Sequence, residues 1–192
     1  MKTQEQTFTN KFIAQGIEEA AWKELSSDNE TYFKWDEELI AKYIDKWDWD
    51  ELSENGSVIW TSKMLDRFDS YINWSKLTSS LFCGRWNGLK FEKLHIDSLI
   101  SYIEKHEEKW DWKEISEEIE ILDIEKFIDR FSNRIMWQQL ANNRNIMWTV
   151  ELFNKYESQL SSVEDIKESC MWRSLARSRA NTIFSQILTE KE

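Results

Sequence analysis

The sequence has no proline and only four glycines among its 192 residues. Average amino-acid usage would give roughly ten prolines and thirteen glycines in a chain of this length. Because these two residue types most often interrupt helices, their scarcity favours helices without kinks. A chain of this size can bury roughly 70% of the surface that its unfolded form exposes, so residues 1–192 are expected to form a single domain with a sizeable core.

Residues that commonly carry chemistry are also scarce. The two cysteines, Cys83 and Cys170, cannot form a disulfide framework. The two histidines, His95 and His106, do not lie at metal-ligand spacing from each other or from a cysteine. Charged residues interrupt every apolar stretch well before the roughly 18 residues that a membrane helix needs, and the N-terminus lacks the pattern of a secretory signal. We therefore expect a cytoplasmic protein with no metal, no cofactor and no membrane partner.

Catalytic motifs are missing as well. No glycine-rich phosphate-binding loop occurs, and with 36 acidic residues any pair could be chosen as a general acid and base. Asp45, Asp48, Asp50 and Glu51 cluster before Gly56, but they lack the Asp-x-Asp-x-Asp-Gly order of a calcium loop. The sequence therefore predicts a non-enzymatic protein, and an enzyme of an unrecognised class is the alternative that remains open.

What the chain does have is tryptophan, with 12 residues arranged around a recurring pattern, Trp-x-x-Leu or Trp-x-x-Ile. Copies begin at Trp22, Trp49, Trp74, Trp112, Trp137 and Trp172, so successive copies start 27, 25, 38, 25 and 35 residues apart. Self-similarity at a fixed period is typical of stacked repeat arrays. These tryptophans are expected to form the structural core of about six degenerate units, each near 25 residues long.

Each unit is predicted to contain a longer helix followed by a short one. Asp48, Asn73 and Asp111 stand directly before a motif tryptophan, where a side-chain oxygen can cap the first helical turn. Further caps open segments whose apolar residues recur at helical spacing; they are Asp36, Thr61, Asp123 and Thr149. The residue after the motif leucine or isoleucine is small in every copy, which would let neighbouring helices approach closely. The predicted fold class is therefore all-α, a helical repeat array.

Two motif strings resemble a unit found elsewhere. Lys46-Trp47-Asp48-Trp49-Asp50-Glu51-Leu52-Ser53 and Lys109-Trp110-Asp111-Trp112-Lys113-Glu114-Ile115-Ser116 resemble K-W-D-W-x-x-L-S, which occurs in tandem in bacterial repeat proteins of no established activity. The likeness covers the aligned units from Phe12 to Leu175. It implies an α-helical repeat fold and no reaction, and degenerate outer copies are expected because terminal repeats cap a stack.

Three segments depart from the period. Residues 1–11 are predicted to be a polar N-terminal tail, and residues 79–96 and 158–169 to be insertions. Asn87-Gly88 lies between apolar stretches, which indicates either a small β-hairpin around 81–96 or an inserted loop with one turn. The second insertion is polar, and a lengthened helix after Thr149 would accommodate it.

Negative charge is concentrated in two blocks. Residues 18–69 contain six basic and 15 acidic residues, and residues 97–129 contain four basic and 12 acidic residues, so their net charges are −9 and −8. Such blocks are either solvated faces or surfaces that attract a basic protein, including a nucleic-acid-handling enzyme that an acidic mimic could inhibit or adapt. The acidic residues proposed for partner binding are Asp45, Asp48, Asp50, Glu51, Glu107, Glu108, Asp111, Glu114, Glu117 and Glu118.

Aromatic residues outside the motif are the other candidates for partner binding. Trp35, Trp86 and Trp148 lie at less regular positions and are expected to be exposed anchors. Leu122 is expected to take the equivalent place after the copy at Trp112.

A weaker alternative is nucleic-acid binding. Residues 130–192 have a net charge of +2, and the candidate contacts are Arg85, Arg173, Arg177 and Arg179. The preferred interpretation remains a regulatory protein that binds another protein through an acidic helical surface.

Overall fold

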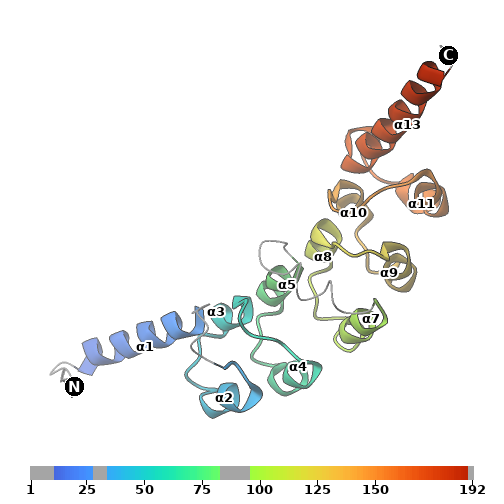
Figure 1. Ribbon diagram of the computed structural model, residues 1–192. Coiled ribbons are helices and arrows are strands. Elements are labelled where there is room, and N and C mark those ends of the chain that lie inside the picture. The colour runs from blue at the N-terminus through green and yellow to red at the C-terminus, as the bar shows by residue number, and fades with distance from the viewer. Residues whose placement is uncertain (1–10, 28–33, 83–95, 190–192) are drawn as a thin grey trace. The chain divides into compact units, whose positions relative to one another are not determined.

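The computed structural model describes residues 11–27, 34–82 and 96–189, and within these ranges all regular secondary structure is helical (Figure 1). The predicted all-α helical-repeat class is therefore confirmed. Most of the segment for which a hairpin was considered lies outside the described residues, but its first two residues, Leu81 and Phe82, end a helix.

The chain divides into two compact units, residues 1–80 and 81–192. The first unit contains α1 (Lys11–Ser27), α2 (Glu37–Lys42), α3 (Trp49–Glu54), α4 (Ser62–Phe68) and most of α5 (Trp74–Phe82). The second contains α7 (Ile96–Glu104), α8 (Trp112–Glu118), α9 (Ile124–Phe131), α10 (Trp137–Asn142), α11 (Val150–Lys155), α12 (Glu157–Leu160), a 3₁₀ helix (Ile166–Glu168) and α13 (Cys170–Thr189).

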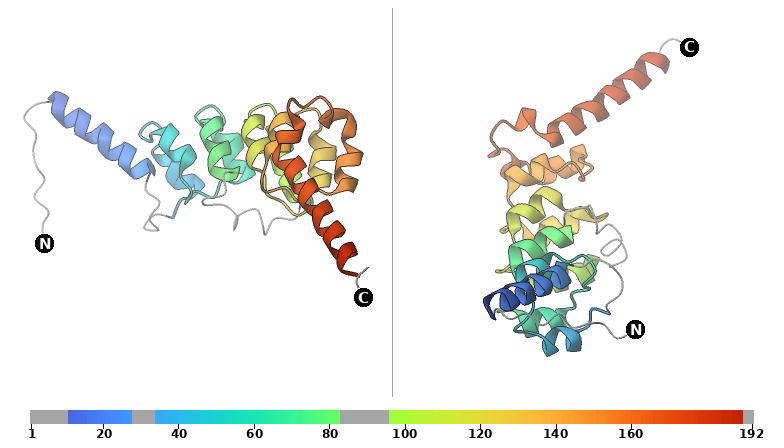
Figure 2. Two further views of the ribbon diagram at one scale, coloured as in Figure 1. Left: turned by 90° about the horizontal axis from the view of Figure 1, so that it is seen from above. Right: turned by 90° about the vertical axis from the view of Figure 1, so that its left-hand side faces the viewer.

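Two kinds of helix alternate in each unit. The motif helices α3, α5, α8 and α10 begin at a motif tryptophan, and α1 and α13 contain one. The linking helices are α2, α4, α7, α9 and α11. In the second unit the motif helices α8 and α10 lie side by side in one layer and the linking helices form the other (Figures 1 and 2).

The linking helices are not longer than the motif helices, contrary to expectation. Both kinds span six to nine residues outside α1 and α13. The linking segment instead continues as a hydrogen-bonded turn, because α2 ends at Lys42 and the backbone N–H groups of Lys46 and Trp47 both donate to Tyr43 O. The helical spacing of apolar residues persists through this turn, which explains the overestimate.

All seven predicted caps are confirmed. In each case the side-chain oxygen accepts a backbone N–H two or three residues further along, at 3.0–3.4 Å; the caps are Asp36, Asp48, Thr61, Asn73, Asp111, Asp123 and Thr149. Caps of this kind satisfy N–H groups that have no partner within the helix, and each contributes about 1 kcal/mol. Short helices depend on this contribution because isolated six-residue helices are unstable in water.

Four of the motif tryptophans pack against an aromatic residue of the linking segment that follows them. In the first unit Trp22 lies 5.3 Å from Tyr43, and Trp49 lies 5.0 Å from Tyr71, between ring centroids. The second unit repeats this arrangement, with 5.1 Å between Trp112 and Phe131 and 5.5 Å between Trp137 and Tyr156. The tryptophan therefore joins one repeat to the next, as expected of a core residue. Trp172 is 38% exposed, whereas the other motif tryptophans are half-buried.

The insertion at 158–169 does not lengthen the helix that follows Thr149. The helix α11 ends at Lys155, and the chain continues through the short α12 and the 3₁₀ helix. The side-chain amide of Gln138 fixes the intervening loop, because its Nε2 donates to Glu164 O at 3.3 Å and its Oε1 accepts from Glu164 N at 3.0 Å.

Candidate binding surface

Serines that follow the motif link successive repeats through their hydroxyl groups. Ser116 Oγ donates to Trp112 O at 2.7 Å and accepts the backbone N–H of Met136, at the next motif, at 3.0 Å. Ser26 and Ser53 make the same pair of bonds in the first unit. The sequence predicted only that this position is small, but the hydroxyl also satisfies a backbone N–H between two repeats.

Buried asparagines form a second link between repeats. Asn143 is 2% exposed, and its Nδ2 donates to Ser116 O at 3.2 Å and to Ile119 O at 3.0 Å. Its Oδ1 accepts Asn145 N at 2.8 Å. Asn55 has the equivalent position in the first unit, because it lies six residues after Trp49 as Asn143 lies six after Trp137, and its Nδ2 donates to Ser26 O. Neither asparagine was predicted to be functional or structural, although their shared spacing from the motif tryptophan is visible in the sequence.

Many of the acidic residues proposed for partner binding are engaged within the fold. Asp48 and Asp111 are helix caps, and Asp50 accepts the side-chain amide of Asn73 at 2.7 Å. Glu51 pairs with Lys23 at 3.2 Å, while Glu107 and Glu108 both pair with Arg134. Asp45 is exposed in the turn after α2.

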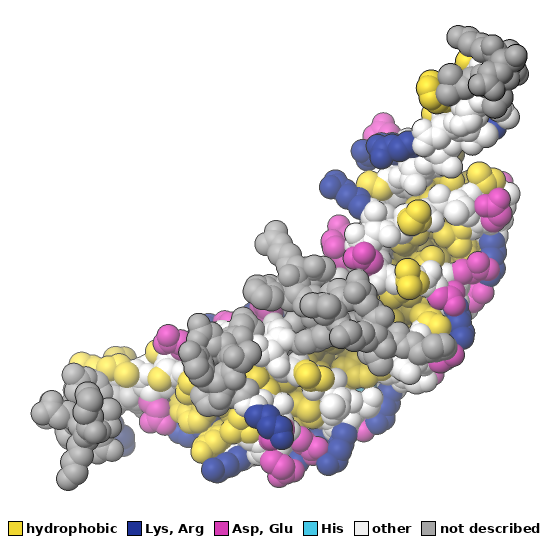
Figure 3. Space-filling model, viewed as in Figure 1, with side chains coloured by type: hydrophobic (Ala, Val, Ile, Leu, Met, Phe, Trp, Pro, Cys, Tyr) yellow, Lys and Arg dark blue, Asp and Glu magenta, His cyan; other side chains and the backbone are white. Residues whose placement is uncertain are grey.

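Further ion pairs join consecutive linking helices. Arg67 of α4 contacts Glu37 of α2, Arg130 of α9 contacts Glu104 of α7, and Lys155 of α11 contacts Glu125 and Asp129 of α9. Figure 3 shows acidic and basic side chains interleaved along the edge of the second unit where α9 and α11 lie. Much of the formal charge of the acidic blocks is therefore compensated by a cation about one repeat away.

The ion pairs shift the pKa of the groups involved. The Lys155 ammonium, followed by the Tyr156 hydroxyl, lowers the pKa of Asp129. Burial, followed by a hydrogen bond to Asp129, raises the pKa of Tyr156 to about 12. Lys63 and then Arg67 lower the pKa of Glu37. These carboxylates are stabilised in their charged form by the fold itself.

The C-terminal end of α8 differs from this arrangement. In the part of the chain that the structure describes, Glu117, Glu118 and Glu120 form no ion pair. Partial burial, and then the charges of Glu117 and Glu114, raise the pKa of Glu118, and Arg144 opposes this only in part. Folding therefore brings negative charges together here at an energetic cost.

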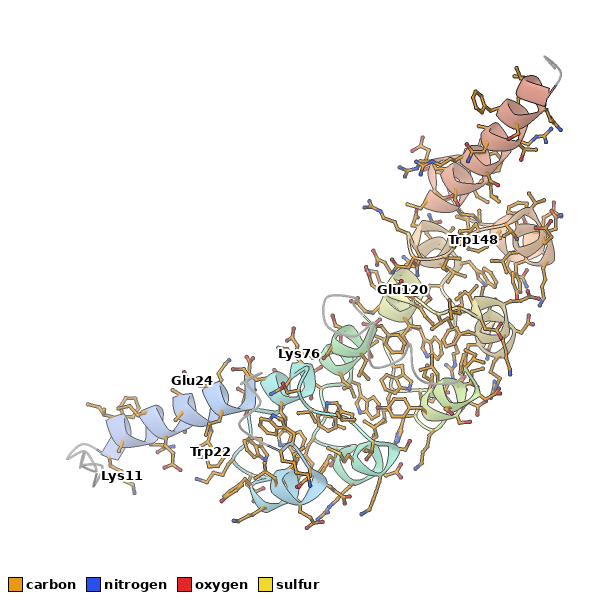
Figure 4. The ribbon with its side chains drawn as sticks, viewed as in Figure 1. Lys11, Trp22, Glu24, Lys76, Glu120 and Trp148 are labelled. Carbon is orange, nitrogen blue, oxygen red and sulfur yellow. The ribbon has the colours of Figure 1, made fainter. Side chains whose placement is uncertain are left out.

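Two exposed apolar side chains lie beside these carboxylates. Leu122 is fully exposed and Met147 is 87% exposed. Their loops are neighbours, because Asn145 Nδ2 donates to Glu118 O and Asn143 Nδ2 donates to Ile119 O, both at 3.0 Å. We define the α8 patch as Glu117, Glu118, Glu120, Leu122 and Met147; Glu120 is labelled in Figure 4.

The aromatic anchors were predicted incorrectly. Trp35 is 9% exposed and Trp148 is 3% exposed, so both are core residues, whereas Leu122, which was aligned with them, is fully exposed. The exposed position is instead ten residues after the motif tryptophan, where Ile59, Leu122 and Met147 are 68%, 104% and 87% exposed. Counting from the motif rather than from the cap would have found this position. Trp86 and Arg85 lie outside the described residues.

The three C-terminal arginines have different surroundings. Arg173 is held by the preceding turn, since its guanidinium donates to Glu168 O at 2.9 Å and to Ser169 O at 3.4 Å. Arg177 and Arg179 are exposed on α13. No acidic residue lies within α13, and its three arginines all lie in the first half of the helix.

Comparisons with known proteins give no relative: no family model, no curated protein sequence and no solved structure matches the chain. Among the described residues, no group of three or more His, Cys, Asp or Glu side chains is arranged to hold a metal ion. None of the described helices combines the length and the apolar character that crossing a membrane requires.

Proposed function

We propose that this chain is a non-enzymatic interaction or regulatory protein whose α8 patch binds a basic partner protein. The observation that carries the proposal is the contrast between this patch and the carboxylates that join consecutive linking helices. Carboxylates along the linking helices are paired with cations of the next repeat, whereas Glu117, Glu118 and Glu120 have no ion pair in the described residues.

The chemistry of the patch defines the partner that fits it. Partial burial, and then the charges of Glu117 and Glu114, raise the pKa of Glu118, and a lysine or arginine side chain beside it would favour its charged form. Leu122 and Met147 offer apolar contacts next to these charges, and methionine adapts to partners of different shape. An amphipathic segment with a basic face and an apolar face supplies both. A cationic groove for DNA or RNA is one such surface, so competition with nucleic acid would be a means of inhibition.

A synthetic helical peptide with a lysine- and arginine-rich face and a leucine face tests the patch directly. Binding is measured by isothermal titration calorimetry at several salt concentrations for the wild type and for the double variant Glu117→Gln/Glu120→Gln. Each exposed ion pair contributes up to about 1 kcal/mol, so we expect affinity to fall by about five-fold to thirty-fold.

The matched control is Glu157→Gln/Glu164→Gln, which removes two exposed carboxylates of the same unit outside the patch. The control should bind the peptide within about two-fold of the wild type. Equal loss in both double variants would mean that only net charge matters, and affinity that ignores salt would exclude an electrostatic surface. Either result rejects the patch as the binding site.

Nucleic-acid binding through α13 is the second candidate. Exposed Arg177 and Arg179 on a helix without acidic residues favour it. Retention of single-stranded DNA or RNA binding by Arg177→Glu/Arg179→Glu would eliminate this alternative.

A further inference from the structure

The C-terminal helix α13 has an exposed apolar stripe. Trp172, Ala176, Ala180, Ile183, Phe184 and Ile187 recur at helical spacing on one face of this helix. The rings of Trp172 and Phe184 are 38% and 63% exposed, and Ile183 and Ile187 are 43% and 47% exposed. Figure 3 shows basic side chains near the start of α13 and an apolar group near its C-terminal end.

The repeat itself indicates what covers such a stripe. In the other copies a motif tryptophan packs against an aromatic side chain, as Trp49 does against Tyr71 and Trp137 against Tyr156. Charged side chains of one repeat also pair with opposite charges on the next, as Lys23 of α1 does with Glu51 of α3. The complement of α13 is therefore a helix with an aromatic residue, apolar neighbours and a carboxylate.

The N-terminal helix α1 has these features on a face that is exposed. Phe12 is 85% exposed, and Ile13 and Ile17 are 48% and 46% exposed. One face of α1 contains Ile13 and the residues four, seven and eleven positions after it, which are Ile17, Ala20 and Glu24. Glu24 is labelled in Figure 4. Gly16 lies beside them, and a Cβ atom placed on it would meet nothing within 4 Å.

We propose that α13 of one copy packs against this face of α1 in a second copy. Aliphatic residues of both helices would then cover each other. Glu24, which has no ion pair in the described residues, complements a helix that has three arginines and no acidic residue. Gly16 and Ala20 leave room for a close helix contact.

The contact joins two different surfaces, so it is heterologous: each copy can bind one neighbour through α1 and another through α13. Such contacts produce rings or open chains rather than a closed two-fold dimer. One helix pair buries less than a standard interface, and we therefore expect assembly that is weak and depends on concentration. This inference does not use the α8 patch, so the two proposals can fail independently.

Sedimentation velocity of the full chain, from about 10 μM to 1 mM, tests the proposal with two variants. Ile17→Lys places a cation on the α1 face, opposite the arginines, and Phe184→Lys places one in the α13 stripe. Both side chains are substantially exposed in the single chain, so both variants should retain the wild-type circular dichroism spectrum. Ile59→Lys is the control, because Ile59 is 68% exposed but belongs to neither surface.

The wild type and the Ile59→Lys variant should associate as concentration rises, and each of the other variants should remain a monomer. An equimolar mixture of the Ile17→Lys and Phe184→Lys variants should form a one-to-one dimer and nothing larger, because only one intact α1 face and one intact α13 stripe remain. A monomeric wild type, a monomeric mixture, or an Ile17→Lys variant that associates like the wild type would each overturn the proposal. The last result would mean that α13 contacts some surface other than α1.

Discussion

Removal of the Asn143 side chain should destabilise the second unit far more than its position after a surface helix would indicate. The Asn143→Ala variant leaves Ser116 O, Ile119 O and Asn145 N without the hydrogen bonds that the carboxamide makes at 2.8–3.2 Å. A buried hydrogen bond contributes about 1 kcal/mol net, and a buried polar group left without a partner costs about 1–3 kcal/mol. We expect a loss of about 2–4 kcal/mol, because adjustment of the loop would recover part of the cost.

Thermal unfolding followed by circular dichroism measures this loss. For a chain of this size about 1 kcal/mol corresponds to roughly 2–4 °C, so the midpoint should fall by about 5–15 °C. The adjacent Asn142→Ala variant is the control, because Asn142 is exposed and its Nδ2 donates to Gln138 O of its own helix. It should change stability by less than about 0.5 kcal/mol. Similar midpoints for the two variants would refute the conclusion that Asn143 links two repeats.

Two further substitutions test local energetics. Glu118→Gln should stabilise the fold at pH 7, because the raised pKa of Glu118 means that its charged form is disfavoured in the folded state. The gain in stability should shrink as the pH falls through the folded-state pKa, and it should vanish below the unfolded-state pKa of about 4.3. A difference in unfolding midpoint that does not depend on pH would contradict this cause. Gly16→Ala should stabilise α1 by about 0.5–1 kcal/mol, because alanine favours the helix more than glycine and its Cβ would meet no atom within 4 Å. The gain should appear as a stronger helical circular dichroism signal at 222 nm. A weaker signal would indicate an unrecognised contact at this position.

Local features of the fold were predictable because their causes are local. A cap acts on N–H groups two or three residues away, so Asp48 or Thr149 can be recognised from its own short segment. The apolar spacing of the linking helices has the same origin. The exact helix lengths were not predictable, because a hydrogen-bonded turn after α2 keeps the side-chain spacing of a helix.

The charged surface was predicted less well because pairing depends on residues one repeat away. Counting charge in blocks did not reveal that Glu37 pairs with Arg67, or that Glu104 pairs with Arg130. These partners are 30 and 26 residues apart, close to the repeat period. A search for opposite charges at that spacing would have identified these two ion pairs.

Burial of the irregular tryptophans could not be predicted from spacing alone. Adjacent residues in an extended loop point to opposite sides, so Trp148 lies in the core while Met147 is exposed. A shift of one residue in the alignment exchanges the two assignments. The alignment from the cap places Leu122 with Trp148, whereas the alignment from the motif places it with Met147 and Ile59.

The second unit shows how one scaffold can carry different surfaces. Motif helices share the tryptophan, the buried aliphatic residue and the small residue after it, but their outward positions differ in charge. Glu117 on α8, Asn142 on α10 and Arg177 on α13 all lie five residues after their motif tryptophan, and all are exposed. Because these positions contribute little to the core, their charge can change without loss of the fold. The α8 patch and the α13 stripe have no residue in common, so a basic peptide bound at α8 should leave sedimentation of the chain unchanged.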